Sequence, residues 1–195
     1  MPSVIRMRRA SLRPITLGIA AGFALVGLVL ASVVGSQVSD DFAVLASRNL
    51  GLPLPNLKRA DILHDTFDEG RANGRPHEAT DIMAPRGTPV LAIGDGTVTK
   101  LFYSRIGGNT VYEFDSLQTY CYYYAHLDGY ASGIREGMSV HKGDVLGYVG
   151  SSGDASPDAP HLHLAIFRLG PEKQWWVGTA INPYPLLMKT LDEQR

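Results

Sequence analysis

Residues 161–167 read HLHLAIF, in which His161 and His163 alternate with Leu162 and Leu164. Because a β-strand sends residues i and i+2 to the same face, both imidazoles point one way and the leucines point toward a core. Short runs rich in Val, Ile, Tyr and Thr precede this strand: TPVLAI at 88–93, GTVTKLFYS at 96–104, TVYEF at 110–114, TYCYYYAHL at 119–127 and VLGYVG at 145–150. Such runs, separated by Gly and Pro, predict a mostly antiparallel β domain.

The β-rich region indicates how the rest of the chain is divided. We place the domain at residues 57–188 and a short tail at 189–195. No segment beyond Leu50 has convincing helical periodicity. Residues 35–56 are expected to hold a short juxtamembrane helix and then a linker, LGLPLPN, whose two prolines end the helix.

Charge is unevenly distributed along the 195 residues, which carry 18 Lys and Arg against 19 Asp and Glu. Four arginines lie within residues 1–14, ahead of the first acidic residue, so the remaining 14 basic residues face 19 acidic ones and leave a net charge of −5. Residues 15–34, ITLGIAAGFALVGLVLASVV, carry no charge over a length that can span a bilayer as a helix. They predict a transmembrane helix or an export signal, with residues 1–14 as a cytoplasmic basic tail.

Sequence alone leaves open whether this segment is retained or cleaved. The apolar run is longer than the core of an ordinary signal peptide, but Val33 and Gly35 offer a small-residue cleavage site before Ser36. We favour a retained membrane anchor over a cleaved signal and a secreted domain. Either way, the domain after residue 34 is expected outside the cytoplasm.

Composition excludes several classes of protein. With 45% hydrophobic and 19% charged residues, the chain is not an intrinsically disordered one. The single cysteine, Cys121, cannot form a disulfide within the chain, and its position among strand tyrosines indicates a buried thiol. The acidic balance of the domain argues against a nucleic-acid partner.

Three groups of residues could support metal chemistry. The first is the pair His161 and His163, the second is His77 with Asp81 in HEATD, and the third is His126 in YAHL. Imidazoles and carboxylates bind zinc, and catalytic zinc sites commonly use three protein ligands with a fourth position open to water. Each pattern alone is a weak signal, and no His follows at the spacing of the helical HExxH metalloproteases.

Taken in order, H-x-x-x-D, YAHL and HLH resemble the lysostaphin-type zinc endopeptidases, which cut peptide cross-bridges of bacterial peptidoglycan. The similarity extends over residues 65–183 and includes several further motifs in family order: DTF, the GR before His77, DIMAPRGTPVLAIGDGTV at 81–98, GGN at 107–109, G-x-x-V-x-x-G-D-x-L-G at 137–147, GSSG at 150–153 and INP at 181–183. The resemblance implies a mainly β fold, a two-sheet antiparallel sandwich or barrel hybrid with an open cleft.

Carried over residue by residue, the resemblance implies that His77, Asp81 and His163 bind one Zn²⁺ ion. It also implies that His126 and His161 are catalytic histidines beside the metal-bound water, and which of them is the base stays open. The implied substrate is the peptide part of peptidoglycan, either stem peptides or cross-links. The implied location is the bacterial cell envelope, with the periplasm favoured.

The residues around these positions carry further expectations. The family usually has Gly where this chain has Ala79, so the path of the loop is expected to differ. Glu78 adjoins a ligand but points away from it in an extended segment, so it is not favoured as a base. Tyr124 is expected to share the face of the YAHL histidine. Two histidines match no family position and are expected at the surface: His64 and His141.

Two other interpretations compete with an active peptidase. A catalytically inactive relative would bind the wall or activate another hydrolase, but all five chemically relevant positions are filled. The 137–147 motif also resembles biotin or lipoyl carrier domains, where a hairpin presents a modified lysine. That hairpin motif is absent, and Lys142 lies in the wrong element.

Overall fold

The computed structural model describes residues 40–71 and 74–194. Asp40 begins a compact unit that continues to the C-terminus. The predicted basic tail at 1–14 and the predicted membrane segment at 15–34 lie outside the described residues. Among the residues that the structure does describe, no helix has the length and apolar character needed to cross a membrane.

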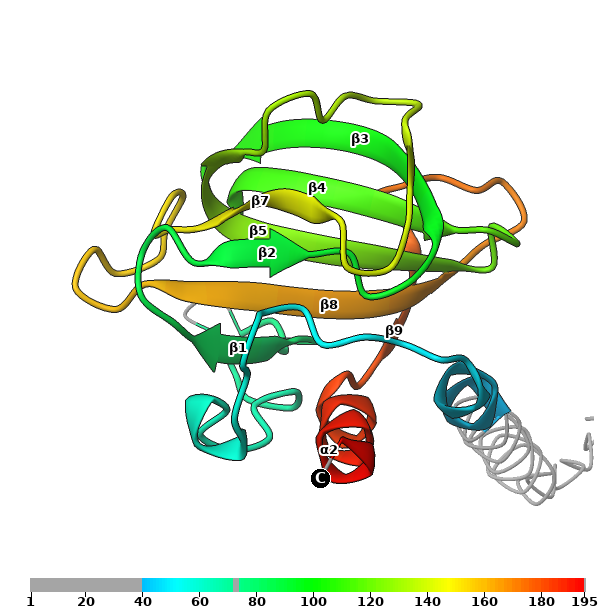
Figure 1. The fold of residues 1–195 in the computed structure, drawn as a ribbon, viewed down its shortest axis with the longest axis horizontal. Helices are drawn as coiled ribbons and strands as arrows, with labels where there is room; N and C mark the ends of the chain where they lie inside the picture. Colours follow the sequence, from blue (N-terminus) through cyan, green and yellow to red (C-terminus); the bar gives the residue numbers. More distant parts are fainter. Residues whose placement is uncertain (1–39, 72–73, 195) are drawn as a thin grey trace, which may run out of the picture. The chain divides into compact units, whose positions relative to one another are not determined.

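Strands dominate the described part of the chain, which confirms the mainly β prediction (Figure 1). The strands are β1 (Thr80–Met83), β2 (Pro89–Leu91), β3 (Gly96–Ser104), β4 (Gly108–Asp115), β5 (Tyr120–Tyr130), β6 (Ser139–Val140), β7 (Val145–Val149), β8 (His161–Leu169) and β9 (Gly178–Ile181). The helical elements are residues 40–47, a 3₁₀ turn η1 (Arg59–Asp61) and α2 (Tyr184–Glu193).

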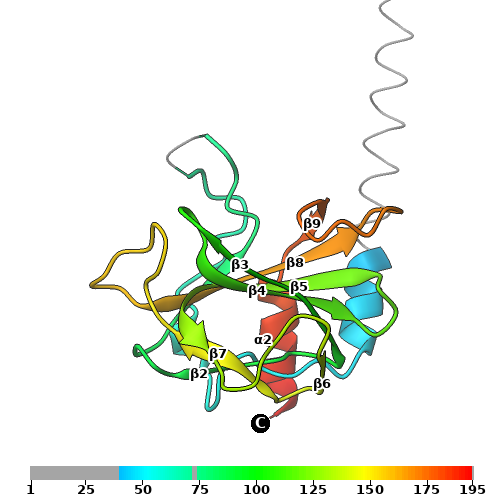
Figure 2. The ribbon, with the colours of Figure 1, turned by 90° about the horizontal axis from the view of Figure 1, so that it is seen from above.

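The strands form one hydrogen-bonded antiparallel sheet, with the order β1-β8-β5-β4-β3-β6 along its main path. The expectation of two separate sheets is wrong, because β5 belongs to both layers. Its first part pairs with β4 and β8, and its last part, from Leu127 to Tyr130, pairs with β7 with a register shift between Leu127 and Gly129. The β2–β7 pair therefore lies across the interior from the long strands (Figures 1 and 2).

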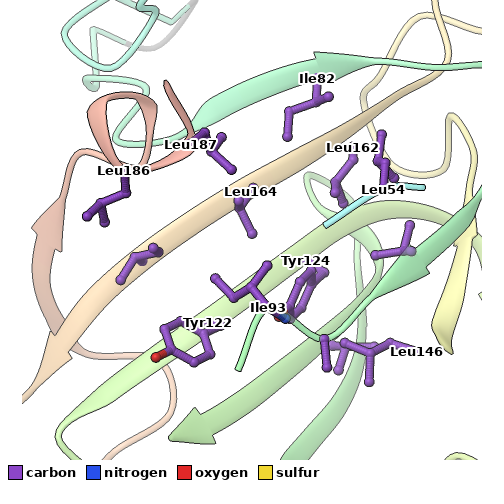
Figure 3. Close-up of a cluster of buried hydrophobic side chains, with 14 of the residues drawn as sticks. Leu54, Ile82, Ile93, Tyr122, Tyr124, Leu146, Leu162, Leu164, Leu186 and Leu187 are labelled. Carbon is purple, nitrogen blue, oxygen red and sulfur yellow. The ribbon is translucent and has the colours of Figure 1, made fainter. Parts of the chain in front are cut away.

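The core fills the interior of this curled sheet. Leu162 and Leu164 of β8 are fully buried, as the alternation in HLHLAIF predicts, and Ile82 of β1 packs beside them. Figure 3 shows these side chains together with Leu186 and Leu187, which α2 contributes from outside the sheet. The β8 face that points away from this core is free to carry the histidines.

The helix α2 lies beyond Leu50, where the sequence shows no convincing helical periodicity, and it crosses the predicted boundary between residues 188 and 189. It is only ten residues long and begins beside Pro183, with Asn182 Oδ1 accepting a hydrogen bond from the Tyr184 amide. Ten residues hold fewer than three turns, so the apolar positions repeat too few times to reveal helical periodicity.

Residues 40–56, the described part of the segment expected to be a juxtamembrane helix and linker, contain the expected short helix and pack onto the domain. Residues 40–47 are helical, and Leu45 is fully buried in the core. The Tyr120 hydroxyl donates to Asp41 at 3.0 Å, and Leu54, within the predicted linker, is 3% exposed. The side chains of Leu45 and Leu54, one on each side of residue 50, are removed from water. The compact unit therefore begins at Asp40, on the N-terminal side of the predicted start at residue 57.

Candidate metal and catalytic site

The pairing of β1 with β8 brings two of the predicted ligands together. Asp81 lies directly opposite His163 in the antiparallel register, on the face of the sheet that points away from the core. Asp81 Oδ1 is 3.0 Å from His163 Nδ1. Two segments 82 positions apart in the chain therefore contribute to one site through ordinary strand pairing.

His77 joins them from the segment that precedes β1. Its Nε2 lies 3.1 Å from Asp81 Oδ1 and 3.0 Å from His163 Nδ1. On the other side of the ring, the Nδ1–H group donates to the Thr66 carbonyl oxygen at 3.1 Å. This second hydrogen bond fixes the orientation of the ring and leaves the Nε2 lone pair directed at the site.

The three atoms form a donor set that suits a zinc ion. Two imidazole nitrogens and one carboxylate oxygen converge, and His77, Asp81 and His163 are the group of described residues whose ligand atoms could hold a metal. A set of two histidines and one carboxylate has the composition of catalytic zinc sites, in which one position stays open to water.

Arg71 contacts this donor set. Its guanidinium donates to Asp81 Oδ2 at 2.6 Å, so the two carboxylate oxygens have different partners. Burial opposes the charge on Asp81, but the close contacts with His163 and His77 outweigh it and hold the pKa of the carboxyl well below its usual range. Asp81 is therefore an anion in the folded protein. Sequence reasoning missed Arg71, and no motif pointed to it.

A β-bulge places His126 at the site. Between the pairs Asn109–Leu127 and Val111–Tyr124, β5 advances three residues while β4 advances two. His126 adopts a left-handed backbone conformation there, with φ of 60°. The extra residue reverses the alternation of β5 and turns the His126 ring toward His161, with the two ring centroids 4.9 Å apart.

The loops of the GGN and GSSG motifs hold the His126 ring in place. The Nδ1–H group donates to the Ser152 carbonyl oxygen at 2.9 Å. Gly108 has φ of 64°, and a Cβ atom there would lie 2.1 Å from Ser152 Oγ, so only Gly allows the two loops to approach so closely. Burial is the main reason that the pKa of His126 falls to about 4.

His161 is held in the same way on β8. Its Nδ1–H group donates to the Ala159 carbonyl oxygen at 2.9 Å, and its Nε2 lies 3.8 Å from Asp81 Oδ1. His126 and His161 thus share one arrangement, in which Nδ1 is engaged by the backbone and Nε2 is available. Their equivalence explains why the sequence does not distinguish the base from the other histidine.

The bulge corrects the prediction for Tyr124. This residue was expected to share the face of His126, but it is fully buried in the core and its hydroxyl donates to Glu113 at 2.8 Å. Tyr123 lies on the site face instead, with its ring edge-on to His163 at a centroid distance of 6.0 Å. The simple alternation of a strand fails here because it assumes no inserted residue.

The remaining expectations concern residues near the ligands. Ala79 is fully buried and is not among the residues with positive φ, so it fits the loop without the glycine that is usual in the family. The left-handed residue is its neighbour Glu78, with φ of 55°, whose side chain is exposed. Cys121 is buried, which raises the pKa of its thiol. Two histidines lie at the surface as predicted: His64 and His141.

The three candidate ligands and the two neighbouring histidines line a cleft of about 480 Å³. The five predicted site residues all border it. Arg71, Arg75 and Asp154, which follows the GSSG motif, also border the cleft. An open cleft with convergent polar groups is the usual form of a site for a small or extended ligand.

Comparisons with known proteins relate the chain to a peptidase family. A model of Peptidase family M23 matches residues 75–183. The L-Ala--D-Glu endopeptidase of Bacillus subtilis (strain 168) is 37% identical over 142 residues, which cover 69% of this chain and 42% of that protein. The Peptidoglycan DD-endopeptidase ShyC of Vibrio cholerae is 39% identical over 99 residues, which cover 51% of this chain and 22% of that protein.

Among solved structures, the catalytic domain of lysostaphin from Staphylococcus simulans aligns with a TM-score of 0.52 and 26% identity. The alignment covers 75% of this chain and 96% of that domain. The chain spans less than half of the length of either curated relative. Because the family model covers more than half of the chain, the resemblance inferred from the motifs is confirmed, and the protein belongs to peptidase family M23.

Proposed function

We propose that this protein is a zinc endopeptidase that hydrolyses peptide bonds of bacterial peptidoglycan. The convergence of His77, Asp81 and His163 at 3.0 to 3.1 Å is the observation that carries the proposal. Two curated relatives are named for different bonds, L-Ala–D-Glu in one and DD in the other. We therefore propose stem peptides or cross-links as the substrate class.

The residues divide into metal ligands and groups that handle protons. A zinc ion bound by the three ligands would polarise the scissile carbonyl group and lower the pKa of water to about 7. Arg71, bound to Asp81 Oδ2, leaves Oδ1 as the oxygen that faces the two histidine ligands. Arg71 is thus a positioning residue for the carboxylate ligand.

His126 and His161 supply the proton transfers in this proposal. Each ring has Nδ1 engaged by a backbone carbonyl group, so Nε2 carries the lone pair toward the cleft. One of them accepts a proton from the attacking water and returns it to the leaving amine. The other, if it has taken up a proton from solvent before the attack, donates a hydrogen bond from Nε2 to the oxyanion.

We propose further that this chemistry takes place outside the cytoplasm, because peptidoglycan lies there. The uncharged segment at 15–34 would serve as the membrane anchor and the arginines of residues 1–14 would set its orientation. In this arrangement the anchor would hold an acidic domain near an anionic wall, which does not attract it by bulk charge.

The direct test is digestion of purified cell-wall sacculi by the full chain in mild detergent with zinc. Mass spectrometry of the released fragments is expected to show cleavage at one class of peptide bond. A chelator should abolish the release, and added zinc should restore it. A zinc-loaded protein that is inert on sacculi from both Gram-negative and Gram-positive cells would overturn the proposal in favour of a wall-binding or activating role.

A further inference from the structure

A row of aromatic side chains leads away from the candidate metal site. Tyr123 lies edge-on to His163, and its ring centroid is 4.6 Å from that of Tyr112 on β4. Tyr112 in turn lies 4.7 Å from Trp175, which belongs to the loop between β8 and β9. Trp175 then contacts Trp176 at 5.0 Å. We call these four residues the aromatic strip.

The two tryptophans of the strip have different surroundings. Trp175 is half-buried and packs against the small cluster formed by Phe114, Cys121 and Leu169. Trp176 is 60% exposed and has no place in either hydrophobic cluster of the described residues. Packing in the small cluster therefore explains the position of Trp175. The aromatic surface of Trp176 is exposed to solvent and is not needed for packing.

The strip borders a groove that lies beside the metal site. This groove, of about 300 Å³, is lined by Tyr112, Tyr123 and Trp176 together with the ligands His77 and His163. Tyr123 and both ligands also border the main cleft, so the two hollows share a wall. A ligand held at the metal site can thus extend directly onto the strip.

The two sides of the site differ in charge. The main cleft is lined by both arginines and carboxylates, Arg71 and Arg75 with Asp81 and Asp154, whereas the groove has no Lys or Arg among its described lining residues. Glu78 is its one carboxylate, and its side chain is exposed. A substrate carboxylate would therefore be favoured on the arginine side, and a neutral group with hydroxyl donors on the aromatic side.

We propose that the aromatic strip binds the glycan part of the wall polymer, with a neutral pyranose ring stacked on Trp176. A pyranose ring has an apolar C–H face, which suits an exposed indole. The hydroxyl groups at its edge can donate hydrogen bonds to the carboxylate of Glu78. This inference rests on the proposed function, because it assumes that peptidoglycan lies across the metal site. The strip would then recognise the saccharide next to the peptide that is cut.

The test compares two substrates that present the same peptide bond. One is intact sacculi, and the other is the peptide fraction freed from the glycan by an amidase. For Trp176→Ala in the full chain, we expect the ratio of the rate on sacculi to the rate on freed peptides to fall about tenfold relative to the wild type. Trp176→Phe, which keeps an aromatic ring, should recover part of this ratio. Tyr103→Ala is the matched control, because Tyr103 is 64% exposed and lies outside the lining of the groove.

A second measurement does not depend on turnover. Titration of the zinc-free protein with N-acetylglucosamine oligomers should change its tryptophan fluorescence, and Trp176→Ala should lose that change. An equal loss of rate on both substrates would mean that the strip contacts the peptide, and unchanged rates on both substrates would mean that it contacts neither. Either result, or the absence of a fluorescence change, would overturn the inference. A wild type inert on both substrates but responsive to the oligomers would instead count against the proposed function alone.

Discussion

The two faces of β8 have different roles: one face packs into the core, and the other contributes to the candidate metal site. Leu162 and Leu164 point into the core and are fully buried, whereas His161 and His163 point into the cleft. Period-two alternation keeps the two sets apart although they are neighbours in sequence. The comparison implies that substitutions on the cleft face should alter metal binding and the rate of hydrolysis. Substitutions on the core face should alter the free energy of unfolding.

The largest effect is expected on the cleft face from His163→Ala. Removing one of three ligands should eliminate stoichiometric zinc and cost several kcal/mol of transition-state stabilisation, which is on the order of 10⁴-fold in rate. Zinc content and sacculus digestion measure the two effects. The control is His141→Ala, since His141 lies exposed outside the cleft. One zinc per chain and a normal rate in His163→Ala would contradict the ligand role.

The second prediction separates the other histidines of the cleft from the ligands. His126→Ala and His161→Ala should each lower the rate by about 10²- to 10⁴-fold, which is typical of a lost general acid or base. Both variants should keep one zinc per chain, because neither residue belongs to the three converging ligands. A variant that lost zinc together with activity would move its residue into the ligand set.

The third prediction concerns the core face of the same strand. Leu164→Ala removes a fully buried side chain, and the cavity should lower the free energy of unfolding by about 2–5 kcal/mol. Urea denaturation monitored by circular dichroism measures this change. Zinc stoichiometry of the folded fraction should remain that of the wild type. A loss of zinc with unchanged stability would show that the two faces are not independent.

The smallest effect is expected at Glu113, which lies in the core beside Tyr124. Burial raises the pKa of Glu113 to about 8 in the folded protein, from an ordinary value of about 4.5. The folded state therefore holds a proton that the unfolded chain releases between these values, so stability falls as pH rises through this window. We expect Glu113→Gln to remove roughly 1–2 kcal/mol of the decrease between pH 5 and pH 7. Chemical denaturation at both pH values tests this, and parallel curves for variant and wild type would contradict it.

The predicted ligand positions came from the family resemblance, and the motifs that carry it are short and local. HLHLAIF specifies its own alternation, and H-x-x-x-D places His77 close to the start of the strand that carries Asp81. The bulge at His126 is different, because the run YCYYYAHL reads equally well with or without an extra residue. Its position is set by how β5 pairs with β4, and that pairing is tertiary information.

Other features also depended on long-range contacts. The docking of residues 40–47 rests on the contact between Asp41 and Tyr120, which are 79 positions apart. The bond from Arg71 to Asp81 comes from a loop with no recognisable pattern. A single sequence reveals the local periodicity of each segment, but it does not reveal which distant segments come into contact when the chain folds.

The edge position of β1 has a consequence for the folded state as a whole. This strand has four residues and is the last member of the main path of the sheet. Short edge strands fray readily, because only one side is hydrogen-bonded. A zinc ion shared by Asp81 and His163 would act as a cross-link between positions 82 residues apart, closing a long loop and opposing that fraying. The ion proposed for catalysis would therefore also hold the rim of its own site in place, so that the supply of zinc would influence how long the folded domain survives.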